Sequence, residues 1–150
     1  MAMRKTAAKK STAPRRGAGE ARGSAARAKR FKVSHAKGAK FSRRGLRGYF
    51  EYRDLGVARA SKGRTVAHVI RARPGKAPKG EWHYHDCELQ FVYVLKGWAR
   101  FEYEGVGTVT MRAGTCFVQP PRIRHRELAH SPDLEMLEVV SPARFGTEGV

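Results

Sequence analysis

From Tyr49 to the end of the chain, short runs of β-branched and aromatic residues alternate with turns rich in glycine and proline. This spacing is typical of an all-β sandwich or barrel, and no run shows the apolar repeat of a helix of about ten residues or more. The expected strands are Tyr49–Arg53, Thr65–Arg71, Glu81–His85, Leu89–Leu95, Trp98–Glu104, Thr108–Met111, Thr115–Val118 and Leu134–Val140. About a hundred residues of this kind can close one β-barrel or jelly roll. The sequence therefore predicts a single all-β domain over residues 49–150.

Residues 1–48 differ in composition from the rest of the chain. They hold 16 lysines and arginines against one acidic residue, Glu20, and so carry +15 of the chain's net charge of +18. The segment is rich in alanine, glycine and serine and has few large apolar residues. It cannot bury enough surface to offset the entropy of ordering it. We therefore expect a disordered basic tail over residues 1–48.

Three interpretations of this tail stay open. Its charge favours non-specific contacts with nucleic-acid phosphates through counterion release, and its bias resembles the basic tails of histone-like proteins. Its arginine and alanine content, with almost no acid, also resembles an organellar transit segment. The third interpretation is a dispensable extension that begins at an upstream start codon.

The sequence also bears on where the protein is found. It has no stretch near the ~20 apolar residues that cross a bilayer, and the start of the chain lacks the apolar region of a signal peptide. Its two cysteines, Cys87 and Cys116, are too few for a disulfide scaffold and fit a reducing compartment, although a disulfide between them stays open. We expect a cytoplasmic protein that does not contact membranes.

Three histidines stand out by their spacing. His83 and His85 lie two residues apart in an expected strand, so both imidazoles point to the same face and can bind one ion. A second segment leaves a strand at Pro120–Pro121, which is a rigid exit because neither proline donates to a sheet ladder, and it ends at His125. Such a turn can direct His125 back into the interior of a barrel.

These two segments resemble the two motifs of the cupin superfamily, whose small β-barrels bind one metal ion. The matching positions are His83, His85, Gln90 and Gly97 in the first motif and Gly114, Pro120 and His125 in the second. The resemblance spans roughly residues 65–140. The sequence departs from the family motifs at four positions, which are Ala77, Gln90 (at the position of the acidic ligand), Arg122 and Ala129.

The resemblance implies a single-domain cupin jelly-roll β-barrel that binds one divalent transition metal. The implied ligands are His83, His85, Gln90 and His125. An imidazole-rich set of this kind suits Fe, Mn, Ni, Co, Cu and Zn alike. Gln90 stands where the family has an acidic ligand, so the ion would keep its full charge and bind less tightly, and Gln90→Glu is expected to tighten binding. Glu88 is the alternative oxygen ligand.

The offset from His85 to Gln90 is odd. A regular strand would place these two side chains on opposite faces, so we expect a bulge or loop at Asp86–Cys87. The side chains expected to line the ligand cavity are His68, Val92, Val94, Phe101, Tyr103 and Phe117. His35 and His130 are expected to be solvated.

Three functions stay open. The resemblance implies a small-molecule metalloenzyme of dioxygenase or isomerase type, for which Glu88 is the candidate catalytic acid or base. The first alternative is a non-catalytic cupin that senses a small ligand or a metal, because fold does not decide function. The second is a nucleic-acid-associated regulator that uses the basic tail. A homodimer is expected from the resemblance alone.

Overall fold

The computed structural model describes residues 18–29 and 31–150, and these form two compact units. The first unit ends at Phe31 and contains the helix α1 (Ala18–Ala28). The second unit is Lys32–Val150. The rest of the predicted tail, residues 1–17 and 30, lies outside the described residues. None of the described helices is both long and apolar enough to cross a membrane.

The second unit is built from strands, with one short helix, α2 (Val57–Ala60), between the first two. Within the described residues the strands are β1 (Phe50–Asp54), β2 (Val66–Ala72), β3 (His83–Asp86), β4 (Leu89–Lys96), β5 (Trp98–Tyr103), β6 (Gly107–Arg112), β7 (Cys116–Gln119), β8 (His125–His130), β9 (Glu135–Ser141) and β10 (Gly146–Gly149). All strand pairs are antiparallel. The predicted all-β jelly roll is confirmed.

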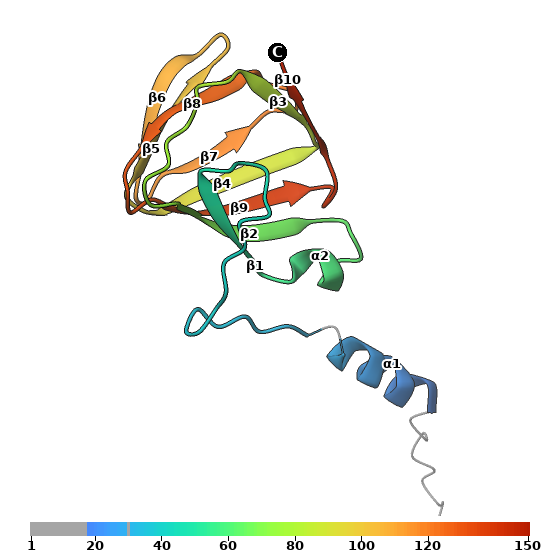
Figure 1. Ribbon diagram of the computed structural model, residues 1–150. Helices are drawn as coiled ribbons and strands as arrows, with labels where there is room; N and C mark the ends of the chain where they lie inside the picture. The colour runs from blue at the N-terminus through green and yellow to red at the C-terminus, as the bar shows by residue number, and fades with distance from the viewer. Residues whose placement is uncertain (1–17, 30) are drawn as a thin grey trace, which may run out of the picture. The chain divides into compact units, whose positions relative to one another are not determined.

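The strands form two five-stranded sheets that face each other (Figure 1). One sheet has the order β1-β2-β9-β4-β7 and the other β10-β3-β8-β5-β6. Alternate side chains point into the space between them: in β5, Ala99, Phe101 and Tyr103 are buried, as the alternation of Trp98–Glu104 predicts. The hydrophobic core fills part of this space and leaves a cavity in the remainder.

All eight predicted strands are present, with ends within two residues of the expected ones. Two strands, β8 and β10, were not predicted. In β8 the inward positions His125 and Glu127 are polar because they line a cavity, so the strand has no apolar alternation. The short β10 contains two glycines, which are unfavourable in strand interiors.

The irregularity expected at Asp86–Cys87 is a corner between the two sheets. Strand β3 ends at Asp86 in one sheet, and β4 begins at Leu89 in the other. The chain therefore changes sheets between His85 and Gln90. Because the sheets face each other, both side chains point into the same interior despite the odd offset.

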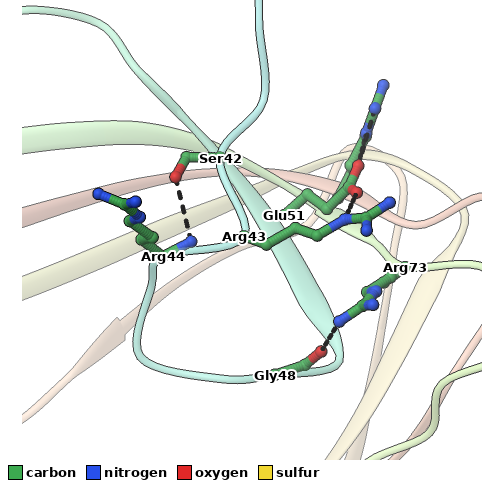
Figure 2. A network of polar contacts seen from close by, with 7 residues as sticks. Ser42, Arg43, Arg44, Gly48, Glu51 and Arg73 are labelled. Atoms are coloured by element: carbon green, nitrogen blue, oxygen red, sulfur yellow. Dashed lines mark hydrogen bonds and ion pairs between the residues drawn. The ribbon is translucent and has the colours of Figure 1, made fainter.

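Residues 32–48, which the sequence assigned to the tail, belong to the barrel unit. Figure 2 shows the segment from Ser42 to Gly48 folded against β1. Ser42 forms an isolated β-bridge with Tyr52, and the Arg43 guanidinium donates to the Glu51 carboxylate at 3.1 Å. Farther along, the Arg73 guanidinium donates to the Gly48 carbonyl at 3.2 Å.

This segment is ordered by specific partners rather than by an apolar core. Glu51 is buried between two arginines, because Arg71 also donates to its carboxylate at 2.8 Å. The same Arg71 guanidinium lies over the Phe41 ring, 3.8 Å from the ring centroid. Composition alone does not reveal such pairings. It gives the number of basic residues but not which of them bind the Glu51 carboxylate.

Arg122 occupies a left-handed backbone conformation, with φ 62°, directly after Pro120–Pro121. The cupin motif has glycine at this position, and the positive φ explains why. Here the residue is held by β3: its N–H donates to the His85 carbonyl at 3.1 Å, and its guanidinium lies 4.7 Å over the Tyr84 ring. The guanidinium also donates to the Tyr84 hydroxyl at 3.1 Å. These contacts offset the cost of a left-handed arginine.

We expect Arg122→Ala to destabilise the fold by about 1 kcal/mol, because it keeps the strained backbone and loses the contacts with Tyr84. Arg122→Gly loses the same contacts but relieves the strain, so it should be more stable than Arg122→Ala by about 1 kcal/mol. Urea denaturation midpoints of the three proteins measure both differences. Equal stability of the alanine and glycine variants would show that φ at this position carries no cost.

Candidate functional site

Three buried histidines converge between the two sheets. His83 and His85 come from β3, and His125 is the first residue of β8. The antiparallel register sets His83 directly opposite His125. The ring centroids lie 4.2 Å apart for this pair and 5.1 Å apart for the other two pairs. One nitrogen of each ring lies within 4.8 Å of the others, which is close enough for one metal ion to bind all three.

The hydrogen bonds of the rings leave the same nitrogen available on each histidine. In all three, Nδ1 already has a partner: for His83 the Glu81 carbonyl at 3.0 Å, for His125 the Ile123 carbonyl at 2.9 Å, and for His85 the Thr147 hydroxyl at 2.8 Å. A carbonyl only accepts, so Nδ1 of His83 and His125 carries the proton and Nε2 keeps its lone pair. Such outer contacts fix the tautomer in histidine metal sites.

Burial keeps these rings uncharged. It lowers the pKa of His85 to about 3, and the nearby His125 and His83 lower it further in the same direction. Burial also lowers the pKa of His125 to about 4, assisted by His83 and Arg47. The pKa of His83 is lowered mainly by burial as well. Neutral imidazole is the form that binds a metal, so all three rings are ready as ligands at neutral pH.

Gln90 lines the same cavity from the opposite sheet and is held in a chain of side-chain hydrogen bonds. Tyr103 donates its hydroxyl proton to Gln119 Oε1 at 2.7 Å, and Gln119 Nε2 donates to Gln90 Oε1 at 2.6 Å. Gln90 Nε2 in turn donates to a carboxylate oxygen of Glu138 at 2.9 Å. This last contact needs an amide at position 90, because a carboxylate has no proton to donate.

Two carboxyl groups that the sequence pattern did not single out line the cavity: the buried Glu127 and the half-buried Glu138. Burial raises the pKa of both, against the opposing effect of His130 on Glu127 and of Gln90 on Glu138. A signal for Glu127 was available, since it lies two residues after His125 in a strand and so shares its face. Neither carboxylate joins the three-histidine group among the residues described.

Glu127 is paired with a histidine that was expected to be solvated. His130 is buried, and its Nδ1 lies 2.8 Å from Glu127 Oε1. The expectation was wrong because the pairing of β8 with β5 shifts at Leu128. This bulge brings His130 to the same inward face as Glu127, although the two are three residues apart.

The cavity has a volume of about 250 Å³. Of the residues expected to line it, His68, Val92, Phe101 and Phe117 do so. Val94 lies in the hydrophobic core, and Tyr103 is stacked on His125 with ring centroids 5.5 Å apart. Glu88, the predicted catalytic acid or base, is exposed and outside the cavity lining, because the corner between β3 and β4 directs it outward.

We expect metal-free protein to show the low pKa of His85 in its stability. The pKa of His85 is about 3 in the folded chain and 6.5 in the unfolded chain, so between these two pH values only the unfolded chain binds this proton. The stability of the wild type therefore falls as the pH falls. His85→Asn removes this contribution. The free energy of unfolding of the variant, relative to that of the wild type, should therefore rise by up to about 1.4 kcal/mol for each unit by which the pH falls below about 6. Urea denaturation in the presence of a chelator measures the difference, and a pH-independent difference would contradict the assignment.

Known proteins provide an independent comparison. Residues 69–140 match the family model of the cupin domain. The polyketide cyclase RemF from Streptomyces resistomycificus superposes with a TM-score of 0.65 at 19% identity, covering 80% of this chain and 85% of that one. KdgF from Halomonas sp. gives 0.58 at 22% identity, covering 76% and 95%. Streptomyces PAC13 gives 0.58 at 13% identity, covering 79% and 89%.

These identities establish similarity of fold and nothing finer. No curated protein sequence matches the chain significantly.

Proposed function

Because residues 69–140 match the cupin domain and three histidines converge in the cavity there, we propose that the chain is a metal-dependent enzyme that isomerises or eliminates a small organic substrate. One observation carries the proposal: three imidazole rings, at least two of them with a free Nε2 lone pair, line the same cavity as the carboxyl groups of Glu127 and Glu138. The first group of side chains suits metal binding, and the second suits proton transfer. Enzyme neighbours described as a polyketide cyclase and a nucleoside dehydratase are in keeping with this chemistry.

The donor set fits a divalent transition metal. His83, His85 and His125 would hold the ion through Nε2, and Gln90 can add its amide oxygen, which has a second lone pair beside the one that Gln119 occupies. When bound, such an ion acts as a Lewis acid that polarises an oxygen of the ligand. Apolar side chains such as Val92 and Phe117 form part of the cavity wall beside these ligands.

The paired Glu127 and His130 are suited to holding and moving a proton. Glu127 faces the cavity, and the buried His130 is its hydrogen-bond partner at 2.8 Å. Burial raises the pKa of Glu127 toward neutrality, where a group works best as an acid or base. We propose Glu127 in place of Glu88 as the catalytic acid or base.

Metal content is the first test. Purified wild-type protein should carry about one metal ion per chain by elemental analysis, and His83→Ala and His125→Ala should each reduce this at least about tenfold, because each removes a buried ligand. Cys116→Ala is the matched control, since Cys116 is exposed and outside the cavity lining. Full metal content in either histidine variant would contradict the site.

The hydrogen bond from Gln90 to Glu138 changes what Gln90→Glu is expected to do. A glutamate there would face the Glu138 carboxylate at hydrogen-bonding distance, and one of two such carboxyl groups stays protonated. The single variant should therefore gain little affinity. The double variant Gln90→Glu/Glu138→Gln restores one donor and one acceptor and should bind metal about tenfold more tightly than the wild type.

Competition titrations against a chromophoric chelator measure these affinities. Weaker binding in the double variant than in the wild type would show that position 90 does not contact the metal.

Turnover separates the proposal from its alternatives. Proton transfer predicts deuterium incorporation from D₂O into small ketones and hydroxy acids, followed by NMR, and Glu127→Gln should abolish it at unchanged metal content. Oxygen uptake without exchange would favour a dioxygenase, and metal binding with neither would favour a sensing role.

The predicted homodimer, the cytoplasmic location and nucleic-acid contacts through the basic tail stay predictions.

A further inference from the structure

The segment before β1 supplies one wall of the cavity. Four consecutive residues, 44–47, line it together with the histidines. The segment is pressed against β1, because a Cβ on Gly45 would collide with the ring of Tyr52. The main chain is fixed as well: the Arg47 N–H donates to the Tyr52 hydroxyl at 2.9 Å, and the Arg47 carbonyl accepts from the Phe50 N–H at 3.2 Å.

Arg47 is the side chain of this wall that stands out. Its Nη2 is buried, yet among the described residues it has no hydrogen-bond partner. A guanidinium carries five N–H donors and a fixed charge, and leaving such a donor buried and unpaired is costly. Burial raises the pKa of Glu127, which lines the same cavity, and the charge of Arg47 opposes this rise, but the Glu127 carboxylate has its hydrogen bond with His130. The positive charge of Arg47 extends to the metal site, since it lowers the pKa of His83 and His125.

We propose that Arg47 binds the carboxylate of the substrate, so that the ligand of this site is a small organic acid held between the guanidinium and the three histidines. The inference rests on the proposed metal-dependent function. It concerns a residue outside the segment that matches the cupin domain.

The surroundings favour a single carboxylate over a phosphate. A guanidinium edge matches the planar geometry of a carboxylate and can bind it through two parallel hydrogen bonds. Glu127 and Glu138 already place two carboxyl groups in the walls, so a doubly charged phosphate would meet more repulsion than a monoanion. The cavity volume of about 250 Å³ lies just below the common range for ligand pockets, so the acid must be small. Side chains such as Ile70 and Phe117 give it apolar walls.

Calorimetric titration of the full-length protein tests this inference with a matched pair of probes. Salicylate and salicylamide have nearly the same shape and both carry an oxygen next to the tested group, but only salicylate is charged. Wild type should prefer salicylate by at least about tenfold. Arg47→Gln should weaken salicylate binding about 10- to 100-fold and change salicylamide binding by less than about threefold, because it removes a charged hydrogen bond.

Lys40→Gln is the control for a general loss of charge. Lys40 is exposed, belongs to the same segment, and is not part of the cavity lining. This variant should bind both probes like the wild type. Thermal melts check the fold of Arg47→Gln, which keeps the two main-chain hydrogen bonds of residue 47.

Metal content, measured on the same samples, separates the possible failures. If Arg47→Gln retains both its metal and the preference for salicylate, the inference is overturned and the proposed function stands. Absence of any salicylate binding to metal-loaded wild type also overturns it. If the protein takes up no metal but shows a preference for salicylate that depends on Arg47, the metal-dependent function fails and the carboxylate contact is supported.

Discussion

The pairing of β3 with β8 sets His83 against His125, and the site depends on this register. A shift by one residue would turn every side chain of β8 to the other face and remove both His125 and Glu127 from the cavity. The turn before β8 protects the register, because the main chain of Arg122 is hydrogen-bonded to His85. The two segments that carry the three histidines, far apart in the sequence, are thus joined by backbone contacts next to the rings that they position.

Burial gives the same cavity its two chemical properties. It lowers the pKa of histidines and raises the pKa of carboxyl groups, since both shifts disfavour charge. The result is a set of uncharged imidazoles beside two carboxyl groups that hold protons more firmly than usual. Gln90 lies within the chain of hydrogen bonds that runs from Tyr103 to Glu138. Its amide oxygen accepts from Gln119, and its amide nitrogen donates to Glu138. The amide at position 90 is thereby matched to its carboxylate neighbour on β9.

Much of the fold follows from the sequence because alternation and turn residues report directly on strands that cover an apolar core. The HxH spacing and the proline exit before His125 likewise reflect local geometry, so the three rings were found. The offset from His85 to Gln90 also predicts the break at Asp86–Cys87 that turns Gln90 inward. What the sequence did not reveal depends on contacts between distant segments: the outward direction of Glu88, the bulge that buries His130, and the partner of Gln90 on β9. Arg43 was assigned to the tail for the same reason, because its buried carboxylate partner, Glu51, lies on β1.

The wall formed by residues 44–47 has a consequence for how such a protein can diversify. The three converging histidines all lie within residues 69–140, whereas this wall comes from a segment well upstream. Sequence changes before β1 can therefore alter this wall of the cavity while the three histidines stay in place. Equally, a fragment limited to residues 69–140 would keep the three histidines but lose this wall together with β1 and β10.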